Sequence, residues 1–188
     1  MKIIKKFVLL IVMLVLISGC DNTSSIHHIE MSIKDKGIIK IELDEKYAPI
    51  TVKNFIKLAN DNFYDGLTFH RIINGFMIQG GSPTGDSNGG LSEKIKGEFL
   101  ANGVENTLKH DRGVISMARA SDYNSASCQF FIMHEKNESL DGLYAAFGRV
   151  TEGMEIVDDI ATNTKVEDSN GTVLKENQPI IEYIKVID

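Results

Sequence analysis

The stretch Phe69–Gly81 reads F-H-R-I-I-N-G-F-M-I-Q-G-G and is the most informative in the chain. Two short apolar runs flank the pair Asn74–Gly75, which predicts a β-hairpin because both residues tolerate the positive φ of a tight turn. The first run carries one cation, Arg71, and the second carries Met77 and Gln79. The hairpin would therefore present a guanidinium, a flexible apolar floor and an amide on one surface. Such a surface suits a peptide with an apolar side chain, and it offers neither a nucleophile nor a set of metal ligands.

These thirteen residues closely resemble the proline-binding hairpin of the cyclophilin-type peptidyl-prolyl cis-trans isomerases. The family pattern F-H-R-[IV]-I-x-[GD]-F-[MV]-x-Q-G-G is filled at every fixed position. Two further family phrases, A-P-x-T-V-x-N-F and Y-D-G-L-x-F-H-R, occur at residues 48–55 and 64–71, and residues 106–118 match its second conserved block. The resemblance covers residues 29–188. It implies a mainly β fold, in which a closed eight-stranded antiparallel β-barrel is capped by two α-helices.

The resemblance also implies a catalytic site centred on Arg71. Rotation about an X–Pro bond crosses a barrier of about 18–20 kcal/mol. A donor aimed at the prolyl nitrogen favours the twisted state, in which that nitrogen regains a lone pair. The guanidinium of Arg71 suits this role because it is rigid and always charged. The residues that the resemblance assigns to substrate binding are Phe76, Met77, Gln79, Ala118, Arg119, Gln129, Phe131, Leu140 and Tyr144. No cofactor and no metal are expected.

Three positions depart from the common family pattern. Arg119 stands where the family usually has Asn, while Ser139 and Tyr144 stand where many eukaryotic members carry Trp and His. Cyclophilins use the main chain at the position of Arg119, so substrate binding is expected to persist. Loss of the Trp side chain predicts weak cyclosporin binding more than lost catalysis. His70 is expected on the face opposite Arg71 and in a structural role, because successive strand residues alternate between faces.

Hydrophobic periodicity and turn residues predict the remaining elements. Pro49 suits the first position of a helix, and Thr151 is expected to cap a second one. The expected helices are 48–60 and 152–162, the expected strands outside the hairpin are 29–34, 37–43, 113–118, 128–134, 145–150 and 179–187, and the expected loops include 82–90 and 167–177. In the first of these loops Asp86 and Asn88 lack the spacing of a calcium site.

The first twenty residues predict export and lipidation. A basic start precedes eleven apolar residues, Phe7–Ile17, a run too short to span a bilayer but typical of a signal peptide. The following Ser18, Gly19 and Cys20 resemble the lipobox of bacterial lipoproteins, in which the cysteine is lipidated and becomes the N-terminus. An ordinary secretory signal and a retained transmembrane helix are the alternatives. The expected organisation is a lipoprotein signal peptide at 1–19, a lipidated tether at 20–28 and the isomerase domain at 29–188.

Charge and cysteine content limit the partners. The formal charge is −6, and removal of the three lysines in residues 1–19 makes it −9, which argues against nucleic acid. With Cys20 lipidated, Cys128 is the remaining thiol, so an intrachain disulfide is not expected. We interpret Cys128 as a packed strand residue. The adjacent His27 and His28 are expected to be solvated within the tether.

Two functions fit these features. The first is a peptidyl-prolyl isomerase that assists the folding of exported proteins, anchored by lipid to the outer face of a bacterial cytoplasmic membrane. The alternative is a chaperone or surface adaptor that binds proline-containing segments with little turnover. A hydrolase is disfavoured because no Ser or Cys has a credible His and carboxylate pairing. The expected partners are proline-containing polypeptides and the membrane, and the protein is expected to be monomeric.

Overall fold

The computed structural model describes residues 25–188. The predicted signal peptide and the lipidation site at Cys20 lie outside these residues. Within them the secondary-structure elements are β1 (Ile26–Ile33), β2 (Gly37–Asp44), α1 (Pro49–Asn60), β3 (Phe69–Ile73), β4 (Met77–Gly80), η1 (Leu100–Asn102), β5 (Val114–Met117), β6 (Phe130–Met133), η2 (Glu138–Leu140), β7 (Ala146–Glu152), α2 (Met154–Asn163), η3 (Lys175–Asn177) and β8 (Ile181–Val186). None of the helices in this part of the chain has the length and apolar character needed to cross a bilayer.

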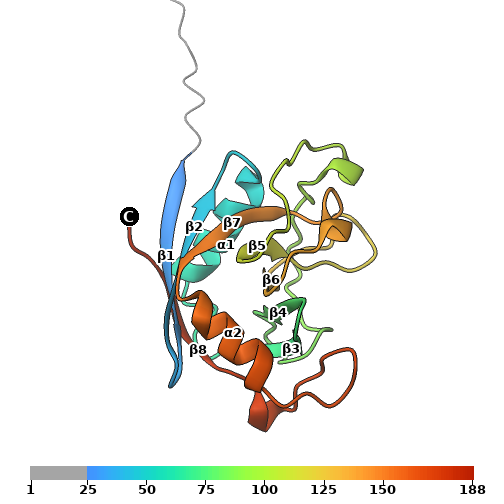
Figure 1. Cartoon of the computed structure of the whole chain (residues 1–188). Helices are drawn as coiled ribbons and strands as arrows, with labels where there is room; N and C mark the ends of the chain where they lie inside the picture. The colour runs from blue at the N-terminus through green and yellow to red at the C-terminus, as the bar shows by residue number, and fades with distance from the viewer. Residues whose placement is uncertain (1–24) are drawn as a thin grey trace, which may run out of the picture.

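The eight strands form one antiparallel sheet in the order β3-β4-β6-β5-β7-β2-β1-β8. The sheet curls into a half-barrel, with α1 toward its upper end and α2 toward its lower end in the view of Figure 1. The mainly β fold with two helices is therefore as predicted, but the prediction of a closed barrel is wrong. Thr68 and Ile180, which directly precede the two edge strands, form an isolated bridge, and the amide of Phe69 donates to the carbonyl of Pro179 at 3.0 Å.

The barrel stays open because another segment occupies the outer edge of β3. The backbone amide of Ile72 donates to the carbonyl of Gly171 at 2.8 Å, and that of Val173 donates to the carbonyl of His70 at 3.0 Å. These bonds use the polar groups through which β3 would otherwise pair with β8. The C-terminal loop thus lies beside the strand that carries Arg71.

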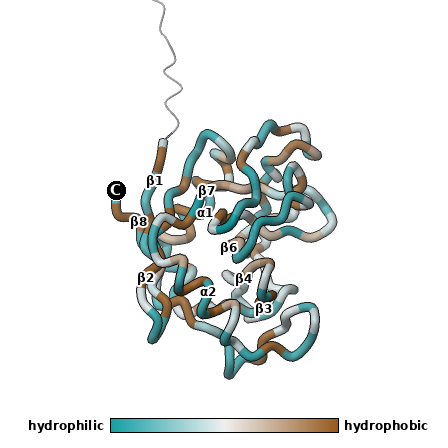
Figure 2. Tube along the Cα trace, in the orientation of Figure 1, coloured by the Kyte–Doolittle hydropathy of each residue, from teal (hydrophilic) through white to brown (hydrophobic). Residues whose placement is uncertain are grey.

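The main core fills the concave side of the sheet. Alternate residues of β1 and β2 are fully buried there, as expected for strands with one face on a core. Phe55 of α1 lies at the centre, where its ring centroid is 4.9 Å from Tyr64, 5.3 Å from Phe147 and 5.4 Å from Phe130. Apolar and polar stretches alternate along the trace in Figure 2, in keeping with this one-sided burial.

The start of α1 agrees with the sequence prediction, and the start of α2 does not. Pro49 starts α1 as predicted, and the buried carboxylate of Glu98 accepts from the amides of Ile50 and Thr51 at 3.0 and 2.7 Å. The prediction that Thr151 caps α2 is wrong. Thr151 belongs to β7, and its hydroxyl donates to the carbonyl of Lys40, while Gly153 in the left-handed conformation precedes the helix.

Strand β1 begins at Ile26, three residues earlier than expected. His27 and His28 are therefore strand residues, where solvated tether residues were expected. Both contact the carboxylate of Asp188: the amide of His28 donates to Oδ1 at 2.7 Å, and Nδ1 of His27 lies 3.0 Å from Oδ2. These contacts join the start of β1 to the C-terminal residue beyond β8.

Candidate active site

Strand register places the central residues in one row across the sheet. Arg71 of β3 pairs with Gln79 of β4, Gln79 pairs with Phe131 of β6, and Phe131 pairs with Ser116 of β5. Residues at paired positions project to the same face of an antiparallel sheet. The predicted hairpin is therefore confirmed, and it brings a cation, an amide and an aromatic ring side by side.

A β-bulge decides the direction of Arg71. The pairing of β3 with β4 shifts between Phe69 and Arg71, which leaves His70 as the extra residue. Without the shift Phe69 and Arg71 would project to the same face, because strand residues alternate. With it, Phe69 is fully buried in the main core and Arg71 lies on the opposite face. The hairpin turn also differs from expectation, since Gly75 alone has positive φ and Asn74 does not.

Three neutral atoms hold the guanidinium of Arg71. Nε donates to the carbonyl oxygen of Asn170 at 2.9 Å, and Nη1 donates to Oε1 of Gln79 at 3.3 Å and lies 4.0 Å from Sδ of Met77. Burial lowers the pKa of Arg71 from its usual value, although an arginine remains charged at neutral pH. Because the charge is not neutralised by these partners, it is available to a ligand.

A cavity of about 240 Å³ lies on this face. Nine side chains and main-chain segments line it, and they include every predicted site residue except Gln129. The lining residues are Arg71, Phe76, Met77, Gln79, Ala118, Arg119, Phe131, Leu140 and Tyr144. The lining of this cavity combines the guanidinium of Arg71 and the amide of Gln79 with apolar and aromatic side chains.

Gln129 lies beside this cavity and faces a larger one of about 480 Å³. Its Oε1 accepts from Nε2 of Gln79 at 2.9 Å, and its Nε2 donates to the carbonyls of Ser87 and Gly89. Gln129 thus connects the amide of the site to the glycine-rich loop 82–90. The two cavities share Arg71 and Gln79 among their lining residues, so they form one continuous surface.

Phe131 forms the apolar wall and is supported from two sides. Tyr144 meets it edge to face, with ring centroids 5.7 Å apart, and His110 stacks on it at 6.0 Å with an interplanar angle of 17°. Together with Met77 and Met133 it belongs to a small apolar cluster separate from the main core. Phe131, Met77 and Met133 are strand residues, whereas Tyr144 and His110 support Phe131 from segments outside the strands.

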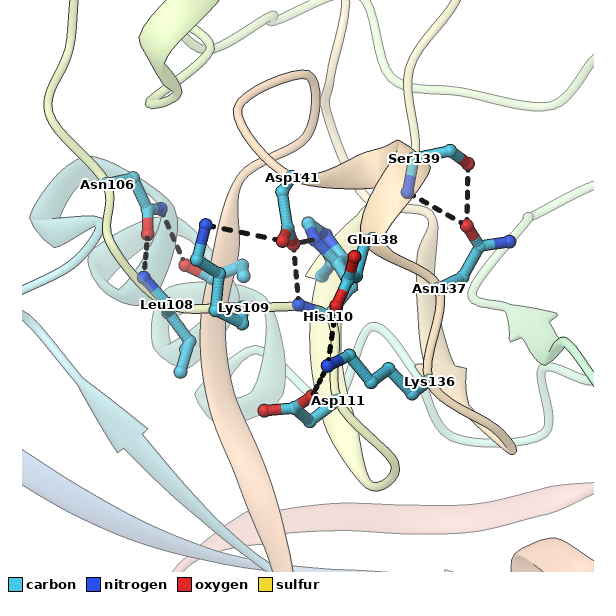
Figure 3. A network of polar contacts seen from close by, with 12 residues as sticks. Asn106, Leu108, Lys109, His110, Asp111, Lys136, Asn137, Glu138, Ser139 and Asp141 are labelled. Atoms are coloured by element: carbon cyan, nitrogen blue, oxygen red, sulfur yellow. Dashed lines mark hydrogen bonds and ion pairs between the residues drawn. The ribbon is translucent and has the colours of Figure 1, made fainter.

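A polar network holds His110 behind that wall (Figure 3). Its Nδ1 lies 3.0 Å from Oδ1 of Asp141, and its Nε2 lies 3.1 Å from the hydroxyl of Ser116. Burial lowers the pKa of His110 against the opposing effect of the Asp141 carboxylate. Burial acts to raise the pKa of Asp141, but hydrogen bonds from the amide and ring of His110 and from Lys109 outweigh it, and this pKa is lowered. A neutral imidazole can satisfy both neighbours, donating from Nδ1 and accepting at Nε2.

The guanidinium of Arg119 forms its hydrogen bonds within the protein. Nε and Nη2 both donate to the carbonyl of Leu143, at 3.0 and 2.9 Å, and Nη1 donates to the carbonyl of Ala120 at 2.9 Å. Its guanidinium carbon lies 4.6 Å from the ring centroid of Tyr144 and 4.9 Å from that of Tyr123. Arg119 therefore joins the two segments that border the cavity.

Two residues considered from the sequence lie apart from the pocket. His70 is 3% exposed, and burial lowers its pKa to about 4. It is absent from the lining of the cavity of about 240 Å³, but it lines a third cavity together with Asp86 and Arg71, so the prediction that it faces away from Arg71 is not confirmed. Cys128 is buried, and burial raises the pKa of its thiol, so it is a packed residue. Among residues 25–188 no three His, Cys, Asp or Glu side chains gather as a metal site would require.

Comparison with known proteins identifies the family. The family described as cyclophilin type peptidyl-prolyl cis-trans isomerase/CLD matches residues 28–186. The chain belongs to the cyclophilin family. It is a peptidyl-prolyl cis-trans isomerase, as the hairpin sequence predicted.

Curated relatives and solved structures agree with this assignment. The cyclophilin described here is 45% identical to peptidyl-prolyl cis-trans isomerase B of Bacillus subtilis over 77% of this chain and 92% of that protein. It is 43% identical to the isomerase of Helicobacter pylori over 71% and 80% of the two chains. A Cryptosporidium parvum cyclophilin, crystallised in the presence of the dipeptide Ala-Pro, superposes with a TM-score of 0.74 at 32% identity, covering 86% of this chain and 99% of its own.

Sequence reasoning missed three residues that position the site of this cyclophilin. Asn170 contacts Arg71 from a loop read only as polar, and His134 accepts at Nδ1 from the amide of Gly75 at 2.9 Å. His110 was noticed only as part of the family's second block. This histidine lies in the segment before β5, and its contacts with Ser116 and Phe131 are tertiary contacts that the sequence alone does not supply.

Proposed function

We propose that this isomerase acts outside the cytoplasm, where a lipid on Cys20 tethers it to the membrane and it assists the folding of exported proteins. The support lies in the sequence of the first twenty residues. Lysines near the start, the apolar run Phe7–Ile17 and the small residues before Cys20 form the order expected of a lipoprotein signal. Two acyl chains would give stable anchoring, since each buried methylene contributes about 0.8 kcal/mol.

We assign catalysis to Arg71. Its Nε and Nη1 are occupied by Asn170 and Gln79, and Nη2 makes no hydrogen bond to any described residue. A donor fixed in this way beside an apolar pocket can meet the prolyl nitrogen when it becomes pyramidal, and it interacts less well with the planar amide. Only such differential interaction lowers the barrier. Because the donor is already oriented, little reorganisation is needed in the twisted state.

The other lining residues hold the substrate. Phe131, Met77 and Leu140 would contact the proline ring, and Gln79 would donate to or accept from the flanking peptide group. The main support for this assignment is the cavity of about 240 Å³, because both the guanidinium of Arg71 and the apolar wall line it. Gln129 and the main chain at Ala118 would contact the polypeptide beyond the proline, on the side of the larger cavity.

The catalytic assignment is tested with Arg71→Ala and Arg71→Lys. We expect Arg71→Ala to lower kcat/KM for an Ala-Pro tetrapeptide about 100-fold, which corresponds to about 2.7 kcal/mol of transition-state stabilisation. Exchange spectroscopy by NMR measures turnover, and peptide titration measures binding. Equal turnover in wild type and Arg71→Ala would refute the role of Arg71. Tight binding by wild type without exchange would instead indicate a proline-binding adaptor.

The location is tested by labelling the full chain in a bacterial host with radioactive palmitate. The expected result is label in the membrane fraction for wild type and for the control Cys128→Ser, and no label for Cys20→Ser. Cys128 is a suitable control because it is the other cysteine of the chain and is buried. Unlabelled wild-type protein in the soluble fraction would contradict the proposal.

A further inference from the structure

We propose that Asp168 is a positioning residue for the isomerisation, which fixes the turn 168–172 so that the carbonyl of Asn170 orients the guanidinium of Arg71. This inference rests on the catalytic role proposed for Arg71. Nε of Arg71 donates to the carbonyl oxygen of Asn170 at 2.9 Å, and the two residues are 99 positions apart in the sequence.

The carboxylate of Asp168 organises the turn. Oδ1 accepts from the amide of Asn170 at 2.9 Å and from the amide of Thr172 at 3.1 Å, and Oδ2 accepts from the hydroxyl of Thr172 at 2.9 Å. The main-chain carbonyl of Asp168 also accepts from the amide of Gly171 at 3.0 Å. One residue therefore fixes the peptide units on both sides of the Asn170 carbonyl.

The turn is docked against the strand that carries Arg71. Gly171 accepts from the amide of Ile72 at 2.8 Å, and Arg71 forms an isolated bridge with Thr172. Gly171 has φ of +80°, and a Cβ placed there would lie 2.2 Å from the carbonyl oxygen of Ile72. The docking therefore requires glycine at this position, and it leaves the Asn170 carbonyl in one location relative to Arg71.

Asp168 lies away from the proline pocket, so it would act on catalysis through Asn170 and Arg71. It lines a cavity behind β3, formed with residues of α2 and of the 164–171 segment, and it is absent from the lining of the proline pocket. Nε is the guanidinium nitrogen nearest the side-chain stem. A fixed acceptor there sets the plane of the whole group, and both Nη atoms follow. Asp168 thus determines the direction in which Arg71 presents its donors.

The test compares Asp168→Ala with Asp168→Asn and with the matched control Asp44→Ala. An asparagine at 168 retains the Oδ1 acceptor and can still bond the hydroxyl of Thr172. Asp44 accepts from the amide of Lys46 at 2.8 Å, also two residues along, but lies in β2 away from the pocket. The measurements are kcat and KM for an Ala-Pro tetrapeptide, the thermal unfolding midpoint, and the Nε–H resonance of Arg71, assigned by its loss in Arg71→Lys.

Asp168→Ala is expected to lower kcat about tenfold with KM within about twofold, and to shift the Arg71 Nε–H resonance and speed its exchange with water. Asp168→Asn should retain most of the wild-type kcat and most of the wild-type position and exchange rate of the Arg71 Nε–H resonance. Wild-type kcat and an unmoved resonance in Asp168→Ala would overturn the proposal. So would equal losses in Asp168→Ala and Asp44→Ala that track the unfolding midpoint. If Arg71 itself proves dispensable, its catalytic role fails, whereas the resonance still reports whether Asp168 orients it.

Discussion

Gln79 accepts a hydrogen bond from Nη1 of Arg71 at 3.3 Å, and through the other end of its amide it donates to Gln129 at 2.9 Å. The amide serves both neighbours, because its oxygen accepts from Arg71 and its nitrogen donates to Gln129. Gln79 therefore orients the guanidinium of Arg71 without neutralising it. It also links that guanidinium to the loop that Gln129 holds.

This relationship predicts that Gln79→Glu is harmful although it changes few atoms. A carboxylate would pair with Arg71 and compete with the prolyl nitrogen for its donors, and it would leave Gln129 without its donor. We expect kcat to fall about tenfold or more at pH 7, since a charge-assisted pair is roughly twice as strong as a neutral hydrogen bond. Peptide exchange measured by NMR checks this. Activity equal to wild type at pH 7 would contradict the competition.

Phe131 and Phe130 give a second prediction, because the two neighbours project to opposite faces of β6. Phe131→Leu should raise KM for proline peptides several-fold, since the wall loses its contacts with Tyr144 and His110. Phe130 packs against Phe55 in the main core, so Phe130→Leu should lower the free energy of unfolding by about 1–3 kcal/mol with little change in KM. Peptide titration and denaturant unfolding on both variants separate the effects. A KM change in the Phe130 variant alone would reverse the assignment.

Arg119 gives a third prediction. Its two donors to the Leu143 carbonyl and its contacts with Tyr144 and Tyr123 depend on the planar fork, which lysine lacks. Arg119→Lys should therefore loosen the border of the cavity and raise KM about threefold, with a loss of about 1–2 kcal/mol in unfolding free energy. Arg149→Lys is the control, because Arg149 is an exposed residue paired with Glu42. Equal effects of the two substitutions would argue against a special role for Arg119.

The sequence predicted the hairpin, both helices and nine of the ten site residues lining one pocket, because each depends on local pattern or on a family motif. It did not predict the bulge at His70 or the contact from Asn170. Both depend on pairing between distant segments, and a one-residue shift of register moves a side chain to the other face. The open barrel escaped prediction for the same reason, since residues 171–173 compete with β8 for the edge of β3.

His70 gives the last prediction, which concerns stability and pH. Burial lowers its pKa to about 4, whereas an unfolded chain has a histidine pKa of about 6.5. The folded state therefore binds this proton less readily. Well above pH 6.5 the residue is neutral in both states, so proton binding to His70 does not change the free energy of unfolding. As pH falls from 6.5 toward 4, the unfolded state takes up the proton and the folded state does not. Stability is lost through this window, by about 3 kcal/mol in all, and the loss levels off below pH 4.

His70→Leu removes this titration and isolates it from other groups, including His110, whose pKa burial also lowers. Urea unfolding of wild type and His70→Leu at several pH values between 4 and 7.5 provides the measurement. The difference in unfolding free energy between the two proteins should be constant above pH 6.5 and should then move in favour of the leucine variant by about 3 kcal/mol at pH 4. Two parallel curves across the range would mean that His70 has the same pKa in the folded and unfolded states, which would contradict the lowered pKa.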